Sequence, residues 1–535
     1  MDIECGNSLP KLGGVPARIK SEQAGWFLCR YWHLSKPPRP RSRSGTPPNL
    51  GGELCLGLSW LMLAFVAATT FAAPADDLRL IDAVKSSDRA AVRSLIEKRG
   101  DVNAAQPDGT TAVAWAANRD DLETADFLIR AGANVNAANE YGVTPLALAC
   151  TNRSSRMVER LLKAGANPNA RQWTGETPLM ICARTGNAET VKLLLSYEAN
   201  PNAKENEQGH TALMRAVAAK HSEVVRTLIE GRADVRARSN GGFTALLFAA
   251  QQGDIASARL LLAAGADINE ATPKNGTALV VAAASGREDF AIFLLENGAN
   301  PNASDTYGVT ALHYAIPRGI AGIDSVSVVF RPYQEVPPDM QKLVKSLIAH
   351  KANPNATIAK DFPPYSRSPY ALQTSLVGVT PFLLAAAAAD VGLIRTLLEA
   401  GADPQMKARD GATALMMAAG VGRIDERENE QEEANAVEAA KLALMLGNDI
   451  NAPNDKGRTA LHGAAWTGAN AMVEFLVEKG ANLNAKDRGG HTPLALAAGL
   501  APRGGDSASL VRESTMALLQ RLGAQPLPPP RTGTR

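Results

Sequence analysis

Aromatic side chains and net charge are both scarce in this chain of 535 residues. Phe, Trp and Tyr together make up 5% of it, which favours closely packed Ala and Leu helices over a core built on large rings. Basic residues number 56 and acidic residues 54, so the formal charge is only +2. A chain this close to neutral has no overall field to attract nucleic acid, and we expect no nucleic-acid partner.

Motifs for catalysis and metal binding are missing from the sequence as well. No Cys or His spacing fits a zinc site, no phosphate-binding Gly loop precedes Lys-Ser or Lys-Thr, and no Gly-x-Ser-x-Gly elbow occurs. The Asn and Asp residues of the turns alternate with Ala and Pro and lack the acidic density of a calcium loop. We therefore expect no catalytic residues, no metal and no cofactor, and a protein that is not an enzyme.

The N-terminal part of the chain falls into two segments. Residues 1–53 are rich in Pro and Arg, which predicts a disordered or over-extended leader. Residues 54–75 are uncharged and end in small side chains, which predicts a signal peptide cleaved after Ala72 or Ala75. The same segment is long enough to span a bilayer, so an uncleaved N-terminal anchor is the alternative. The expected location is the bacterial periplasm or the secreted fraction, or, if the anchor is retained, the membrane.

A motif with a capping threonine recurs along the rest of the chain. Its form is Gly-x-Thr-Ala/Pro-Leu, and most of the threonines are 33 or 34 residues apart. A period of this length over so many copies indicates a stack of repeated units. The threonines are Thr111, Thr144, Thr177, Thr211, Thr244, Thr277, Thr310, Thr380, Thr413, Thr459 and Thr492.

Each part of the motif has a physical reason. A threonine such as Thr144 can cap a helix, and Pro145 then stands at the first helical position, where its missing N–H costs nothing. A glycine such as Gly165 ends the second helix of the unit in a left-handed conformation. Three units have a side chain at that position instead, and we expect their joints to be softer: these are Glu198, Arg232 and Lys351. In the unit that begins at Thr413, we expect Asn448 at the helix-ending position.

The repeat resembles the ankyrin repeat, whose signature is Thr-Pro-Leu-His-x-Ala. Its closest matches are TALHYA at Thr310–Ala315 and TALHGA at Thr459–Ala464. The resemblance covers residues 76–526, about twelve units with capping units at both ends, and is followed by a Pro-rich tail, 527–535. It implies an all-α fold, a curved solenoid of helix-turn-helix units with β-turn fingers. It also implies a structural hydrogen-bonding role for His313 and His462.

Four insertions interrupt the period. Three lie between the two helices of units eight, ten and twelve, at residues 317–339, 424–436 and 501–507. The fourth, 358–377, lies between units and carries aromatic residues among prolines. It could bind a partner, because stiffness lowers the cost of ordering, or it could pack over the joint between units. For the acidic run within 424–436, a solvated helix extension is the favoured interpretation.

Cysteines are few. Cys5, Cys29 and Cys55 lie in the N-terminal segments, which leaves Cys150 and Cys182 on the first helices of neighbouring units. A bridge between these two is conceivable in an oxidising compartment. We expect instead two buried free thiols that act as small apolar side chains.

The family resemblance implies a protein-binding scaffold, here a monomer with a partner of unknown identity. The concave groove and the fingers are the expected contact surface, and a membrane contact is expected only if residues 54–75 are retained. Alternative functions are a membrane-tethered scaffold, an enzyme whose site is built from the insertions, and an effector delivered to a host cell. The candidate contact residues lie in or beside the fingers: Tyr141, Trp173, Glu176, His210, Arg238, Phe243, Tyr307, Phe362, Tyr365, Tyr370, Arg458 and His491.

Overall fold

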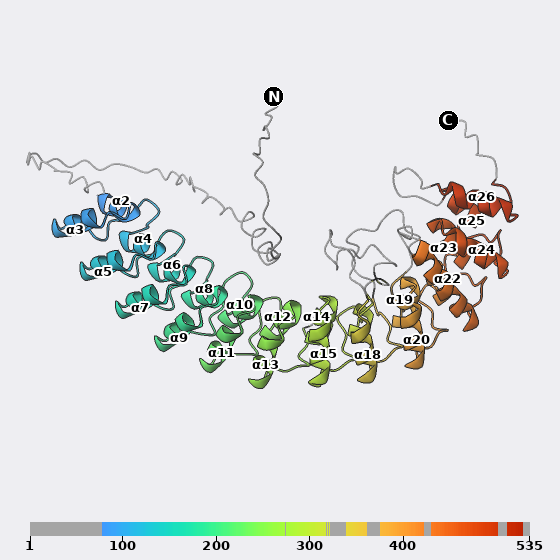
Figure 1. Ribbon diagram of the computed structural model, residues 1–535, viewed down its shortest axis with the longest axis horizontal. Helices are drawn as coiled ribbons and strands as arrows, with labels where there is room; N and C mark the ends of the chain where they lie inside the picture. The colour runs from blue at the N-terminus through green and yellow to red at the C-terminus, as the bar shows by residue number, and fades with distance from the viewer. Residues whose placement is uncertain are drawn as a thin grey trace, which may run out of the picture. The chain divides into compact units, whose positions relative to one another are not determined.

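The computed structural model describes residues 78–272, 274–316, 318, 320, 339–360, 375–421, 430–500 and 511–527. Over these ranges the secondary structure consists of helices that pair into twelve helical hairpins, as the repeat predicts (Figure 1). The all-α solenoid is therefore confirmed. The leader 1–53 and the apolar segment 54–75 lie outside the described residues. In the described ranges no helix combines the length and the apolar character that crossing a membrane requires.

The hairpins stack in two layers. Each first helix contacts the second helix of its own unit and the first helices of its neighbours, and the second helices line up behind them (Figure 1). The first helices are α2 (Arg79–Lys85), α4 (Ala112–Asn118), α6 (Pro145–Thr151), α8 (Pro178–Thr185), α10 (Ala212–Ala218), α12 (Ala245–Gln252), α14 (Ala278–Ala284), α16 (Ala311–Tyr314), α19 (Pro381–Ala388), α21 (Ala414–Ala418), α23 (Ala460–Thr467) and α25 (Pro493–Ala497). The second helices are α3 (Arg89–Glu97), α5 (Leu122–Arg130), α7 (Ser155–Lys163), α9 (Ala188–Ser196), α11 (Ser222–Glu230), α13 (Ile255–Ala263), α15 (Glu288–Glu296), α18 (Gln341–Ala349), α20 (Val391–Glu399), α22 (Glu430–Met445), α24 (Asn470–Glu478) and α26 (Glu513–Arg521).

Nine of the eleven repeated threonines start the first helices in one of two ways, and the other two, Thr310 and Thr459, do so with a histidine side chain. Thr144 has an extended backbone, and its hydroxyl accepts a hydrogen bond from the Ala147 N–H at 3.3 Å. Six units use such a bond, which confirms the capping prediction for them: those of Thr144, Thr177, Thr211, Thr380, Thr413 and Thr492. At Thr111, Thr244 and Thr277 the same extended backbone begins the helix without a side-chain cap.

The second helices end as the sequence predicts. Gly165 has a φ of 87°, in the left-handed region. Glu198, Arg232 and Lys351 adopt the same conformation, with φ of 64°, 64° and 66°, although each carries a side chain that disfavours it. In unit ten the left-handed residue is Gly447, with φ of 90°, and the prediction of Asn448 for this place is wrong by one residue.

The insertions begin and end at hydrogen-bonded positions. In unit eight the Met340 N–H donates to the Ala315 carbonyl at 2.9 Å, and in unit twelve the Arg512 N–H donates to the Ala497 carbonyl at 2.8 Å. The loops between these positions largely lie outside the described residues. In unit ten, α22 has 16 residues and starts at Glu430, which confirms that the C-terminal part of the acidic run extends the second helix.

Asparagine side chains connect each unit to the next. The Asn169 side-chain amide donates to the Glu198 carbonyl at 2.9 Å, and its oxygen accepts from the Asn200 N–H at 2.7 Å. We call the repeated pair of bonds the asparagine ladder; it involves Asn103, Asn136, Asn169, Asn202, Asn269, Asn302, Asn355 and Asn451. Arg236 and Gln405 replace the asparagine in two units, and each donates to a carbonyl of the next unit. The ladder thus provides hydrogen-bond partners for backbone N–H and carbonyl groups that have none within the helices.

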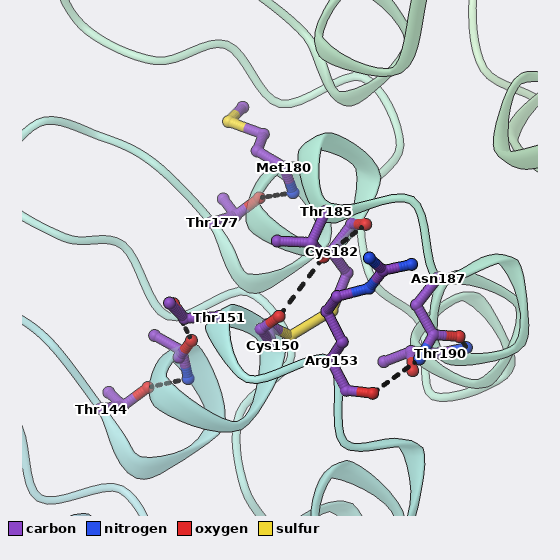
Figure 2. Close-up of a disulfide and its surroundings, with 11 residues drawn as sticks. Thr144, Cys150, Thr151, Arg153, Thr177, Met180, Cys182, Thr185, Asn187 and Thr190 are labelled. Carbon is purple, nitrogen blue, oxygen red and sulfur yellow. Dashed lines mark hydrogen bonds between the residues drawn. A yellow bond between two sulfur atoms is a disulfide. The ribbon is translucent and has the colours of Figure 1, made fainter. Parts of the chain in front are cut away.

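A disulfide joins Cys150 on α6 to Cys182 on α8 (Figure 2). The two Cα atoms are 4.9 Å apart and both cysteines are fully buried. The expectation of two free thiols is therefore wrong. The two cysteines are 32 residues apart, and the stacking of the neighbouring first helices brings them within bonding distance.

Candidate functional site: the fingers and first helices of units three to six

Neighbouring fingers are hydrogen-bonded side by side. A finger is the turn that precedes a capping threonine, and its backbone bonds to the finger of the next unit. The Trp173 N–H donates to the Tyr141 carbonyl at 3.0 Å, and the Asn206 N–H donates to the Thr174 carbonyl at 2.8 Å. The Asn240 N–H continues the row by donating to the Gln208 carbonyl at 2.7 Å. The fingers therefore present their tips as a fixed row.

Tyr141 and Trp173 stand out at these tips. Their exposed fractions are 45% and 53%, and they are the aromatic side chains most exposed among the described residues. They belong to units three and four, whose first helices the disulfide joins. Two rigid, exposed aromatic rings on adjacent fingers are typical anchors for a protein partner.

A charged cluster lies behind the tips of units four and five. The Glu176 carboxylate is 3.9 Å from the Arg184 Nε and 4.0 Å from an Arg215 terminal nitrogen. Glu176 Oε1 and Arg215 Nε are both buried and have no hydrogen-bond partner. Glu176 was predicted as a contact residue, whereas Arg184 and Arg215 were not singled out. The signal that could have found Arg215 is its register, four residues after a capping threonine, where the other units place an uncharged residue.

Aromatic side chains continue the surface in units five and six. The His210 ring packs edge-on against the Phe248 ring, with 5.2 Å between their centroids. The Phe243 ring also packs against the Phe248 ring, with 5.4 Å between their centroids. All three side chains are half-buried. Burial and the nearby Arg215 charge lower the pKa of His210. The structure thus brings His210 and Phe243 together, as two of the predicted contact residues, and adds Phe248.

Glu205 fixes the finger that carries His210. Its carboxylate accepts from the N–H groups of Glu207, Gln208 and His210, at 2.8, 2.8 and 2.9 Å. Burial raises the pKa of Glu205, but these backbone hydrogen bonds outweigh it and hold the pKa below its usual value. Glu205 is therefore a structural carboxylate that shapes the finger.

Three other predicted contact residues lie in fingers with different surroundings. Arg238 is exposed and pairs with Glu270 at 2.6 Å. Tyr307 is half-buried, and its carbonyl accepts from the Ala359 N–H at 2.7 Å, at the base of the insertion 358–377. His491 is half-buried and lies 3.0 Å from Asp487. Phe362, Tyr365 and Tyr370 lie outside the described residues.

Arg458 is not the surface residue that its finger position predicts. It is 9% exposed, and its Nε lies 3.6 Å from the Asp487 carboxylate, which is buried as well. Burial lowers the pKa of Arg458, and the Asp487 charge opposes that shift. The pair holds two neighbouring fingers together, which is a structural role.

His313 and His462 have the structural role that the family resemblance implies. The Thr310 N–H donates to His313 Nδ1 at 3.2 Å, and His313 Nε2 lies 3.3 Å from the Val379 carbonyl of the next unit. The Thr459 N–H donates to His462 Nδ1 at 3.1 Å, and Nε2 lies 3.1 Å from the His491 carbonyl. A ring that accepts at Nδ1 must carry its proton at Nε2 and be neutral. Both histidines therefore cap their own helix and tie it to the following finger.

The described residues include one small hollow. A hollow of about 130 Å³ lies between α18 and α20, below the roughly 300–1,000 Å³ typical of ligand pockets. Within the described ranges no group of three or more His, Cys, Asp or Glu side chains is arranged to hold a metal ion.

Comparisons with known proteins agree with this architecture. Residues 80–172, 168–239 and 246–330 match a family model described as "Ankyrin repeats (3 copies)", and residues 446–497 match "Ankyrin repeats (many copies)". Together these matches cover more than half of the chain.

Similar segments occur in curated proteins of animals and plants. One is 33% identical over 151 residues to ankyrin repeat and SOCS box protein 16 of Mus musculus, covering 28% of this chain and 32% of that protein. Another is 34% identical over 123 residues to the E3 ubiquitin-protein ligase KEG of Arabidopsis thaliana, covering 23% of this chain and 6% of the ligase. A third is 32% identical over 117 residues to the B-cell lymphoma 3 protein homolog of Mus musculus, covering 22% of this chain and 24% of that protein. The chain thus matches less than a third of each relative.

Proposed function

Because this chain belongs to the ankyrin-repeat family, we propose that it is a scaffold that binds another protein through the fingers and first helices of units three to six. The observation that carries the proposal is the pair of exposed rings, Tyr141 and Trp173, on fingers that are hydrogen-bonded to each other. Exposed aromatic anchors on a rigid support bind with little loss of conformational freedom. The similarity to an E3 ligase covers 6% of that enzyme and gives no support for ligase activity here.

Changing Tyr141 and Trp173 together to Ala should weaken capture of the partner by about tenfold or more, because large buried aromatic anchors dominate such interfaces. The measurement is quantitative mass spectrometry after cross-linking in the native cells, followed by a binding isotherm with the partner identified. Both side chains are largely exposed, so stability should change by less than about 0.5 kcal/mol.

Met445→Ala is the matched control for this experiment. Met445 is 83% exposed at the end of α22 in unit ten, outside units three to six, and its loss should leave capture unchanged. Equal capture by the double variant and the control would contradict the proposed surface.

We further propose that the scaffold works in an exported compartment. Two features support this: the uncharged segment 54–75 with its small C-terminal residues, and the disulfide between Cys150 and Cys182, a bond that persists in oxidising surroundings. N-terminal sequencing of the chain recovered outside the cytosol should find a start directly after Ala72 or Ala75. An intact segment 54–75 in a membrane fraction would favour the anchored alternative, and an intact chain confined to the cytosol would refute export.

A further inference from the structure

Two charged side chains of neighbouring units, Glu176 and Arg215, face each other. Four residues after the capping threonine the units place Trp115, Leu148, Ile181, Arg215, Phe248, Val281, Tyr314, Leu384, Met417, Gly463 and Leu496. Arg215 is the one charged residue of this set. Directly before the threonine, Glu176 replaces the Val or Phe of several other units. Stacking brings the Glu176 carboxylate and the Arg215 guanidinium to 4.0 Å.

The cluster of Glu176, Arg184 and Arg215 is electrostatically incomplete. Both contacts with the carboxylate, at 3.9 and 4.0 Å, are longer than a hydrogen bond. One carboxylate oxygen and Arg215 Nε are buried without a hydrogen-bond partner, an arrangement that costs free energy. Within the cluster, two guanidinium groups against one carboxylate leave a net charge of one positive unit, and the Glu205 carboxylate, whose charge also interacts with Arg215, already accepts three backbone N–H bonds. A second carboxylate could accept from the solvent-accessible nitrogens of both arginines and balance this charge.

The surroundings of the cluster restrict what can carry that carboxylate. The side chains of Arg184 and Arg215 are 37% and 26% exposed, so both can be reached from solvent. In the next unit the register position of Arg215 carries Phe248, whose ring packs against those of His210 and Phe243. A carboxylate with apolar groups beside it fits this surface, as in a polypeptide with an Asp or Glu next to an apolar residue.

We propose that Arg184 and Arg215 form a carboxylate-binding site for an Asp or Glu side chain of the partner, with an adjacent apolar residue on the Phe243–Phe248 pair. This inference rests on the proposed function and names the chemistry of the partner. A single net positive charge matches a carboxylate better than a phosphate group, which carries nearly two negative charges. The near-neutral chain likewise has no strong net positive charge to attract a nucleic acid.

The first step of the test is a selection from a display library of short random peptides with the full chain. We expect the bound peptides to be enriched in an Asp or Glu beside an apolar residue. The same selection with Arg184→Gln or Arg215→Gln should lose the acidic enrichment. Thermal unfolding of each variant shows whether it is folded.

The second step uses one selected peptide of known sequence and its amide analogue, in which the acidic residue is Gln or Asn. Arg215→Gln should weaken binding of the acidic peptide by about tenfold or more and leave binding of the amide analogue unchanged. Glu176→Gln should tighten binding of the acidic peptide, because it removes the carboxylate that competes for both arginines. A misfolded variant would not gain affinity. The matched control is Arg226→Gln, which removes an exposed arginine of α11 and should have no effect.

Each outcome decides between the two proposals. Selected peptides without an acidic preference, or equal weakening of the acidic peptide and its amide by Arg215→Gln, would overturn the carboxylate site. The scaffold function would stand in that case, because peptides still bind. A decrease in affinity for Glu176→Gln would show that the three charges only stabilise the fold. If the chain bound no peptide and captured no partner in cells, the proposed function would fail as well.

Discussion

Replacing Cys150 and Cys182 together by Ala should lower the free energy of unfolding by about 3 to 4 kcal/mol under oxidising conditions. The disulfide closes a loop with a sequence separation of 32, and the cross-link removes conformational freedom from the unfolded chain. The loss should concentrate at the joint of units three and four, because each unit in a repeat array is stabilised mainly by its neighbours. Amide hydrogen exchange of α6 and α8 and urea unfolding of the whole chain measure the two effects.

Reductant provides the control for this prediction. It should destabilise the wild-type chain once the buried sulfurs become accessible on unfolding, and it should not change the Ala variant. The contradicting result is alkylation of both cysteines in the denatured, unreduced protein, which would show two free thiols. A reduced joint should also weaken partner binding, because the bridged helices belong to the units whose fingers carry Tyr141 and Trp173.

Acidification should destabilise the array through His313. Burial lowers the pKa of His313 from 6.5 to about 4, because a charged ring would lose its hydration, and the hydrogen bond to the Val379 carbonyl only partly opposes this shift. A proton at Nδ1 would also face the Thr310 N–H, from which the neutral ring accepts a hydrogen bond. The unfolded chain binds the proton more readily than the folded one. The stability that His313 contributes is therefore fully present above about pH 6.5 and is lost as the pH falls towards about 4, by on the order of 3 kcal/mol. Burial lowers the pKa of His462 in the same direction.

Urea unfolding at a series of pH values between these limits tests the prediction. His313→Gln should lower stability at neutral pH but flatten the acid dependence, because an amide does not titrate in this range. Met445→Ala replaces an exposed side chain that does not titrate, and this variant should keep the wild-type dependence of unfolding free energy on pH. The assignment to His313 is wrong if the Gln variant loses stability on acidification as steeply as the wild-type chain.

The fold could be predicted because each unit repeats the same local chemistry. Thr144 with Pro145 and the left-handed Gly165 mark where helices begin and end, and such signals act over a few residues. The stacking of units then follows from their apolar faces. The one-residue error at Asn448 arose because Gly447 and Asn448 both suit a helix end, and the glycine takes the left-handed position.

The candidate site was predicted only in part, because its chemistry comes from neighbouring units. Glu176, His210 and Phe243 were identified from their finger positions, but Arg184 and Arg215 lie within helices and meet Glu176 only after stacking. The burial of Arg458 depends likewise on Asp487 in the next finger. Whether Cys150 and Cys182 were bridged or free depended on the distance between two helices, which spacing in the sequence does not give.

The asparagine ladder makes the joint between units independent of unit length. Asn302 bonds to the Lys351 carbonyl and the Asn353 N–H, which are 49 and 51 residues away, through the same atoms that Asn136 uses across 29 and 31 residues. A unit that gains a loop therefore keeps its place in the stack. Descendants of such a protein can acquire or lose outer loops one at a time, while the spacing between their recognition elements stays constant.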